Sequence, residues 1–249
     1  MGRIVKTFWA VLVFNLLFVL LFPFLLIPIV FSSQHRLTGI INRIWARAFF
    51  VLAFIPFDVE YRAPLNPAKK YIFCPNHFSY LDIPTMGLNK INTVFVGKND
   101  MERVPLFGFM YRRLHITVNR SSLRSRGETM LKSMKAIEEG KSLIIYPEGG
   151  MVANNPPQMK PFKDGAFRTA IEKQIAIVPV TIPFNWIILP DQKTLRLQHG
   201  RMKVIFHEPI ETTGMDVSRI DELKQQVYNV IHIELQKQND ILNSDKNES

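Results

Sequence analysis

A histidine and an aspartate stand five residues apart in the segment Asn76 to Asp82, directly after the short apolar run Tyr71 to Cys74. A histidine can take a proton from a hydroxyl, and a carboxylate can hold its imidazole in one tautomer and orientation. A spacing of five separates side chains by about 140° on a helix and places them on opposite faces of a strand. His77 and Asp82 therefore meet only if the chain bends between them.

The residues around this pair predict that bend. The apolar run is typical of a buried strand, Pro75 and Asn76 end it, and Asp82 then lies in the first turn of a helix beginning at Ile83. His77 would lie at the carboxyl end of a strand, where open α/β sheets bind their ligands. Asn76 and Ser79 either brace the turn or simply form it. Such a dyad is expected to activate a hydroxyl group.

Three other apolar runs also end in polar or glycine residues. Lys98 and Arg120 each follow one run, and Glu148 and Gly149 follow another, within Tyr146-Pro147-Glu148-Gly149-Gly150. Taken alone, Lys98 and Arg120 are typical of surface cations, and the Glu148 segment is more typical of an ordinary turn than of a site. Gathered at the rim that carries His77, they predict a site that takes a phosphate and a hydroxyl.

The apolar pattern predicts an α/β fold with a mixed central sheet flanked by helices. Strand-like runs at 71–74, 93–96, 115–118, 142–146 and 175–182 alternate with helix-like stretches, among them an amphipathic helix at 122–139. Segments 194–198 and 202–207 are typical of a hairpin or two edge strands. A last helix is expected to begin at Ser218, which starts a capping-box pattern, and to lead into a polar tail.

Composition narrows the possible partners. The chain has 249 residues, 47% of them hydrophobic, and a net charge of +10, of which +9 falls between residues 61 and 135. This basic region suits nucleic acid, anionic lipid or a phosphorylated substrate. Six scattered histidines and the single Cys74 provide neither a zinc cluster nor a disulfide framework, so no metal is expected.

The amino-terminal segment indicates a membrane. Residues 8–31 carry no charge, and as a helix they would measure about 36 Å against a hydrocarbon core of about 30 Å. A cleaved signal peptide usually has a shorter apolar run. Two prolines in the run and a second apolar stretch at 40–57 favour a kinked or re-entrant hairpin over a straight span.

These patterns divide the chain into a membrane anchor at 1–60, an α/β domain at 61–240 and a polar tail at 241–249. Arg36, Arg43 and Arg47 outnumber Arg3 and Lys6 on either side of the apolar run. The positive-inside rule therefore places the domain on the cytoplasmic side.

Together these residues resemble the glycerolipid acyltransferase family, in particular 1-acylglycerol-3-phosphate acyltransferases of the bacterial membrane type. The resemblance covers most of residues 70–210. It is carried by Asn76 to Asp82; Lys98 with Pro105-Leu106-Phe107-Gly108 and Arg120; Tyr146-Pro147-Glu148-Gly149; Val178-Pro179-Val180; and the segment Lys160 to Phe167. In one place the chain departs from the family, because Gly150 and Met151 stand where Thr and Arg usually follow the third motif.

The resemblance implies a direct acyl transfer at the bacterial inner membrane. His77, held by Asp82, would deprotonate the free hydroxyl of a lysophosphatidate, which attacks the thioester of acyl-CoA or acyl-carrier protein. Lys98, Arg120, Glu148 and Gly149 would bind substrate, and Lys98, Arg120 or Lys160 would compensate for the missing arginine. Pro147 and Pro179, like Asn76 and Ser79, would support the motifs. No cofactor beyond the donor and no nucleic acid is expected.

Three alternatives remain open from the residues. The Cys74 thiolate could form an acyl-enzyme with His77 as its base. The basic region could make the chain a membrane-anchored protein that binds anionic lipid or RNA, although no nucleic-acid motif is present. Removal of the amino terminus could release a secreted hydrolase.

Overall fold

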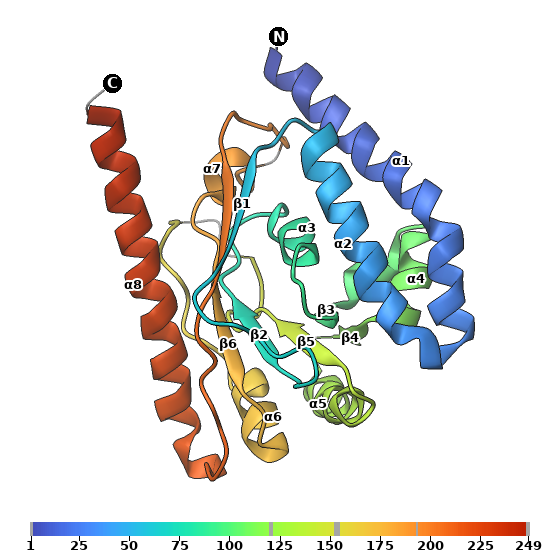
Figure 1. The fold of residues 1–249 in the computed structure, drawn as a ribbon, viewed down its shortest axis with the longest axis vertical. Helices are drawn as coiled ribbons and strands as arrows, with labels where there is room; N and C mark the ends of the chain where they lie inside the picture. The colour runs from blue at the N-terminus through green and yellow to red at the C-terminus, as the bar shows by residue number, and fades with distance from the viewer. Residues whose placement is uncertain (1, 120–121, 152–154, 193, 248–249) are drawn as a thin grey trace.

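The apolar runs form a seven-stranded mixed sheet that lies between two helical layers (Figure 1). The computed structural model describes residues 2–119, 122–151, 155–192 and 194–247. The strands are β1 (Phe57–Tyr61), β2 (Ile72–Pro75), β3 (Thr93–Lys98), β4 (Ile116–Val118), β5 (Ser142–Ile145), β6 (Ile177–Thr181) and β7 (Met202–Phe206).

The strand order places the predicted motifs at one edge of the sheet. The order is β1-β7-β6-β2-β5-β3-β4, and the five strands from β6 to β4 are parallel. β7 is antiparallel to β6 and parallel to β1, which confirms a mixed sheet. Because the carboxyl ends of parallel strands meet at the same edge, the segments after β2, β3, β5 and β6 come together there.

One helical layer is formed by the amino-terminal hairpin and its neighbours. It contains α1 (Gly2–Val30), η1 (Ser32–Gln34), α2 (His35–Leu52), α3 (Asp82–Gly87), η2 (Asn99–Arg103) and α4 (Phe107–Leu114). α1 and α2 run in opposite directions, and Phe14 packs edge-on against Trp45 with ring centroids 4.6 Å apart. Phe50 of α2 and Phe73 of β2 are fully buried in the core that this layer shares with the sheet.

The other layer consists of α5 (Leu123–Glu138), α6 (Gly165–Lys173) and α8 (Ile220–Asn247). Successive strand residues point to opposite faces, so Ile72 and Cys74 join a second core with Val227 of α8, while Phe73 faces the hairpin. The short α7 (Asn185–Ile188) follows β6, and η3 (Val217–Arg219) leads into α8.

The structure corrects the expected hairpin between segments 194–198 and 202–207. Only the second segment is a strand, β7, and the residues described in the first are irregular. β7 pairs instead with β1, because Phe57–Tyr61 extends the sheet beside it in register with Met202–Phe206. The sheet therefore begins within the region that we assigned to the anchor.

The last helix also differs in its boundaries. The Asp216 side chain, rather than that of Ser218, accepts the hydrogen bond from the Ser218 amide at the start of η3. α8 then continues to Asn247, through most of the segment expected to be a polar tail. No glycine or proline interrupts residues 220–247, so local propensity supports a continuous helix.

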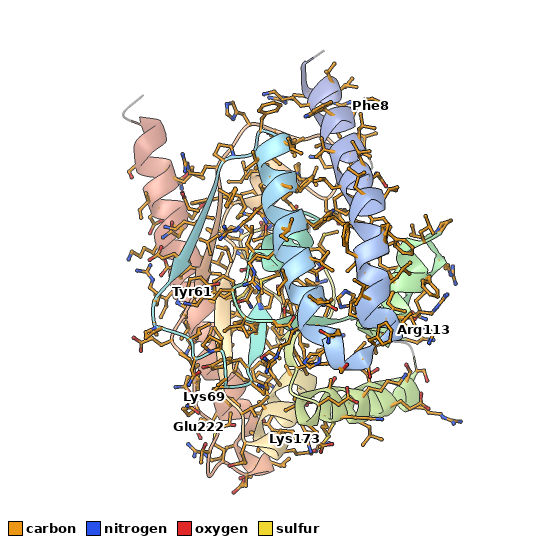
Figure 2. All side chains as sticks on the ribbon, turned by 45° about the vertical axis from the view of Figure 1, so that its right-hand side comes forward. Phe8, Tyr61, Lys69, Arg113, Lys173 and Glu222 are labelled. Carbon is orange, nitrogen blue, oxygen red and sulfur yellow. The ribbon has the colours of Figure 1, made fainter. Side chains whose placement is uncertain are left out.

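The hairpin carries a largely apolar outer surface. Within the described part of the chain, α1 alone is long and apolar enough to cross a membrane, judged by length and composition. Figure 2 shows Phe8 projecting from α1, and it is 70% exposed. Further exposed apolar side chains on α1 and α2 include Leu12, Leu16, Leu20, Phe24, Ile27, Ile40 and Ile44.

Candidate active site

The chain bends after β2 and brings His77 and Asp82 together as predicted. The imidazole Nδ1 lies 3.0 Å from Asp82 Oδ2, with Asp82 fully buried and His77 partly exposed at the carboxyl edge of the sheet. Asp82 begins α3, and Pro84 lies in the first turn of this helix. A proline is tolerated there because the amides of the first turn have no partner within the helix. The carboxylate accepts the proton on Nδ1, which leaves Nε2 as the free base.

A dense set of donors fixes the Asp82 carboxylate. The amides of Phe78 and Ser79 donate to Oδ2 over 2.8 and 2.9 Å, and the Asn185 side chain donates to Oδ1 over 2.9 Å. Asn185 is buried and comes from α7, just beyond β6. These three donors hold the orientation of the Asp82 carboxylate.

Tyr146 supports the imidazole from one face. Its ring stacks on that of His77 with centroids 4.1 Å apart, and its hydroxyl donates to the backbone oxygen of Asp82 over 3.1 Å. Tyr146 follows β5 directly, so two adjacent parallel strands supply the base and its support. This arrangement restricts rotation of the His77 ring.

Glu148 braces the loops of the site. Its Oε1 accepts the His77 amide over 2.8 Å and its Oε2 accepts the Lys160 amide over 2.9 Å. We expected Glu148 to bind substrate, whereas both oxygens bond to this chain's own backbone. Burial raises the pKa of Glu148 to about 7, against the opposing effect of the two amide hydrogen bonds.

Asn76 and Ser79 are structural residues of the bend. The Asn76 side chain exchanges two hydrogen bonds with the backbone of Ile182, at 2.7 and 3.0 Å, and so joins the ends of β2 and β6. The Ser79 hydroxyl donates to the Leu189 carbonyl over 2.6 Å. Both side chains therefore hold the loop that presents His77.

The two motif prolines occupy defined places near this edge. The Pro147 carbonyl accepts the Lys163 amide over 2.9 Å. Pro179 lies opposite Cys74 in the β2–β6 ladder, and its carbonyl accepts the His207 amide over 3.0 Å. The β6–β7 ladder pairs Val180 and Thr181, and Pro179, which has no amide to donate, lies just outside it.

The backbone at position 149 accommodates only glycine. Its φ is +76°, and a Cβ atom there would lie 2.6 Å from the Lys163 side chain. Its amide donates to the Tyr146 carbonyl over 3.0 Å, which closes the turn that we expected to contact substrate. This close approach also places the Lys163 ammonium group over the turn, beside the Glu148 loop.

The predicted cations are distributed around the same edge. Lys98 ends β3, two strands away from β2, and its ammonium group forms an ion pair with Asp100. Arg120 lies outside the described residues. Lys160 and Lys163 are exposed, and neither has a carboxylate within ion-pair distance among the described residues. Sequence reasoning considered Lys160 and overlooked Lys163.

Cys74 does not fit the acyl-enzyme alternative. The thiol is fully buried in the core beneath α5, α6 and α8, on the face of the sheet away from the hairpin. Burial raises its pKa far above that of a free thiol, which disfavours the nucleophilic thiolate. Cys74 is therefore a packing residue.

An apolar cavity of about 140 Å³ lies between the hairpin and the sheet, and Ile83 and Gly87 of α3, the helix that Asp82 begins, border it. Its walls come from α1, α2, α3, β3 and α4, and include Phe14, Phe18, Trp45, Ile83, Phe95 and Met110. His115 also lines it, with Nδ1 accepting the Phe95 amide over 3.2 Å, and burial lowers the pKa of His115 to about 4. A neutral histidine keeps the cavity free of charge.

Sequence reasoning also overlooked the roles of Tyr146 and Asn185. Tyr146 could have been found as the aromatic residue that ends a strand next to the strand of His77. Asn185 gave no local signal, because it lies 103 positions after Asp82 and only the fold brings them together.

The fold and the site define an α/β protein with the His77 and Asp82 dyad at the carboxyl edge of a mixed sheet. The chain belongs to the acyltransferase family, whose model matches residues 56–183. That match contains the dyad, the Glu148 loop and the end of β6.

Three comparisons show which known proteins the chain resembles. It is 26% identical to a chloroplast 1-acyl-sn-glycerol-3-phosphate acyltransferase of Arabidopsis thaliana over 74% of its own length and 51% of that enzyme's. It is 26% identical to the lyso-ornithine lipid O-acyltransferase of Pseudomonas aeruginosa, over 70% and 72% of the two chains. The crystal structure of the 1-acyl-sn-glycerophosphate acyltransferase of Thermotoga maritima shares its fold, with a TM-score of 0.78, 18% identity and coverage of 96% and 98%.

Proposed function

We propose that this chain transfers a fatty acyl group from an acyl thioester to the free sn-2 hydroxyl of 1-acylglycerol-3-phosphate, giving phosphatidic acid. The main support is the His77 and Asp82 dyad at the carboxyl edge of the sheet, together with an apolar cavity that is bordered by Ile83, the residue after Asp82. The family match and the chloroplast relative agree with this reaction. The donor is acyl-CoA or acyl-carrier protein, and no other cofactor is needed.

In the proposed mechanism, His77 acts as a general base. Nε2 takes the proton from the lipid hydroxyl as its oxygen attacks the thioester carbonyl, and Asp82 stabilises the imidazolium that forms. The tetrahedral intermediate collapses with loss of the thiolate, which receives the proton from His77 and leaves as the free thiol. The acyl group thus moves directly from sulfur to oxygen, without a covalent enzyme intermediate.

Lysines near the Glu148 loop are suited to the substrate phosphate. The Lys163 ammonium group lies over the turn that carries Gly149, and the backbone amide of Lys160 binds Glu148 in the same loop. Neither lysine has an acidic partner among the residues that the structure describes. They supply positive charge in the region where the family usually has an arginine and this chain has Met151. Lys98 and Arg120 remain further candidates at the carboxyl edge.

The apolar cavity is suited to an acyl chain. Ile83 and Gly87 of α3 line it, and α3 begins with Asp82, so the cavity starts close to the dyad. Its aromatic and aliphatic walls would remove the chain from water.

The hairpin supports attachment to one side of a membrane. The Thr7 hydroxyl accepts the Leu197 amide over 2.8 Å near one end of α1, and Phe18 contacts Phe107 of α4 further along, with ring centroids 5.6 Å apart. Because the α/β domain holds both regions of α1, the helix is better suited to lie in one leaflet than to span the bilayer. The cytoplasmic face of a bacterial inner membrane agrees with the arginine distribution.

The Pseudomonas relative supports a second lysolipid substrate. The chain matches 72% of the length of that relative, against 51% of the chloroplast enzyme. Lyso-ornithine lipid lacks a phosphate. The absence of the family's usual arginine after Gly149 would matter less for such a headgroup.

The test is an acyl-transfer assay on the full chain in mixed micelles. Lysophosphatidate, glycerol-3-phosphate, lysophosphatidylcholine and lyso-ornithine lipid are each paired with acyl-CoA and with acyl-carrier protein. The proposal expects the highest kcat/KM for lysophosphatidate, and a Lys160→Gln/Lys163→Gln variant should lose about tenfold or more of it through KM. A clear preference for lyso-ornithine lipid would replace the proposed substrate, and consumption of none of the four would reject both.

A further inference from the structure

A second basic site lies at the opposite edge of the sheet from His77. A cavity of about 400 Å³ opens near the amino ends of β2, β3 and β5, where Ile91, Asn92 and Ser142 form part of its wall. Three separate segments supply its cationic lining, which consists of Arg36, Arg43, Lys69, Lys70 and Lys90. His35 also lines it, and burial lowers the pKa of this histidine. Figure 2 labels Lys69 on the loop between β1 and β2.

Most of these cations lack an acidic partner. Among the described residues, no carboxylate lies within ion-pair distance of Arg36, Arg43, Lys70 or Lys90, whereas Lys69 is 3.8 Å from Glu211. This contrasts with α6 and α8, where cations such as Lys173 and Lys224 are paired. Four unpaired cations around one cavity produce a strong positive potential in it.

Backbone contacts hold the cavity in shape. Arg43 donates to the Lys90 carbonyl over 2.7 Å, and Asn92 donates to the His35 carbonyl over 3.3 Å, so α2 is fastened to the loop before β3. The Lys90 ammonium group lies 4.0 Å from the centre of the Tyr61 ring. The cationic groups are thus presented by a fixed framework rather than by independent surface side chains.

The cavity also borders the apolar surface of the hairpin. Ile40 lines the cavity and is 47% exposed, and Ile44 is exposed one turn further along α2. Phe31, just before α2, is also exposed. A ligand that combines an anionic group with an apolar body would match both surfaces at once.

We propose that this cavity binds the phosphate group of an anionic membrane phospholipid, which is not the substrate, and so fixes the orientation of the hairpin on the bilayer. The cationic lining takes the headgroup, and the neighbouring apolar side chains face the acyl chains. An acidic carrier protein would match the charge but would gain nothing from the exposed Ile40 and Ile44.

The test measures vesicle binding without turnover, so it is independent of the proposed function. Purified full-length protein is floated with phosphatidylcholine vesicles, with and without a minor fraction of phosphatidylglycerol. An Arg36→Gln/Lys70→Gln variant is compared with Lys132→Gln/Lys237→Gln, which removes the same charge from exposed lysines of α5 and α8.

The first variant should lose about tenfold or more of the binding gained from phosphatidylglycerol, and the second should keep most of it. Transfer activity in detergent should be unchanged in both. Equal losses would assign the effect to overall charge, and no loss in the first variant would leave the cavity without a lipid role. If the first variant kept its vesicle binding but lost binding of acyl-carrier protein, that carrier protein would be the ligand of the cavity. Each of these three results would overturn the proposal.

Discussion

The two helical layers bury similar cores against the sheet but have different outer surfaces. The outer surface of α1 and α2 exposes large apolar side chains such as Phe8, Leu20 and Phe24. The outer surface of α5, α6 and α8 carries ion pairs, including Arg124–Glu128, Arg168–Glu172 and Arg219–Glu222. Apolar exposure of this extent marks an interaction site, whereas paired charges are typical of a surface in water.

The His77 and Asp82 dyad is joined to the hairpin layer. Asp82 begins α3, which belongs to the hairpin layer, and the apolar cavity lies between that layer and the sheet. A lipid could therefore reach His77 from the membrane without passing fully through water. The same sheet thus has one side suited to lipid and one suited to water.

The largest expected effect comes from placing a charge on the apolar outer surface. Leu20→Arg should weaken vesicle binding by about tenfold to a hundredfold, because an arginine within the apolar layer is costly. Leu131→Arg on α5 is the matched control, since Leu131 is 67% exposed and Leu20 is 58% exposed. Flotation measures both. Equal effects would remove the distinction between the two layers.

A smaller effect is expected from loss of the support beneath the dyad. Asn185→Ala should lower kcat by about tenfold or more with little change in KM, because a buried hydrogen bond to a carboxylate is lost. Asn229→Ala on α8 removes an amide that is hydrogen-bonded to Gln225 on the water-facing side. Steady-state kinetics with both variants checks this, and a normal kcat for Asn185→Ala would show that Asp82 needs no such support.

A buried carboxylate at the site and an exposed one on α8 should make the unfolding free energy depend on pH in opposite directions. Burial raises the pKa of Glu148 to about 7, so its stabilising contribution is complete below the unfolded value of 4.5 and is lost as pH rises through 7. The loss should be about 2 kcal/mol of unfolding free energy relative to Glu148→Gln. Denaturant unfolding in detergent between pH 5 and 8 measures it.

Glu222 provides the control for this measurement. Its ion pair with Arg219 lowers the pKa of Glu222, so its contribution is already complete above 4.5. Glu222→Gln should therefore follow the wild-type pH profile between pH 5 and 8. A flat difference between wild type and Glu148→Gln would show that Glu148 is not buried as described.

The smallest expected effect concerns an ion pair of the water-facing layer. Arg168→Gln should cost at most about 0.5 kcal/mol, since its contact with Glu172 is 3.8 Å long and half exposed. Unfolding free energy and flotation should both remain close to wild type. A large loss of vesicle binding would indicate that α6 also touches the membrane.

Local patterns in the sequence were sufficient to predict the dyad and most of the sheet. The bend between His77 and Asp82 follows from a strand, a proline and a helix start that are adjacent in the chain. The pairing of β1 with β7 was not predictable in this way, because 140 residues separate the end of β1 from the start of β7. Alternating apolar residues identify strands but do not specify distant partners.

The same limit applies to the site. Asn185, Lys163 and the basic cavity all depend on contacts between segments that are distant in sequence. Glu148 illustrates a further limit, since a carboxylate at a strand end can bind substrate or brace the backbone, and only the positions of the His77 and Lys160 amides distinguish these roles. The residue type of Glu148 was enough to predict that it lies at the site, but its role follows only from the structure.

The most direct test of this account is acyl transfer by the His77→Ala variant. Transfer from acyl thioester to lysophosphatidate should fall by about 10² to 10⁴-fold with the far-UV circular dichroism spectrum and vesicle binding retained. His199→Ala, which changes an exposed histidine, should behave as wild type. Turnover close to wild type in His77→Ala would contradict the central claim that His77 is the base.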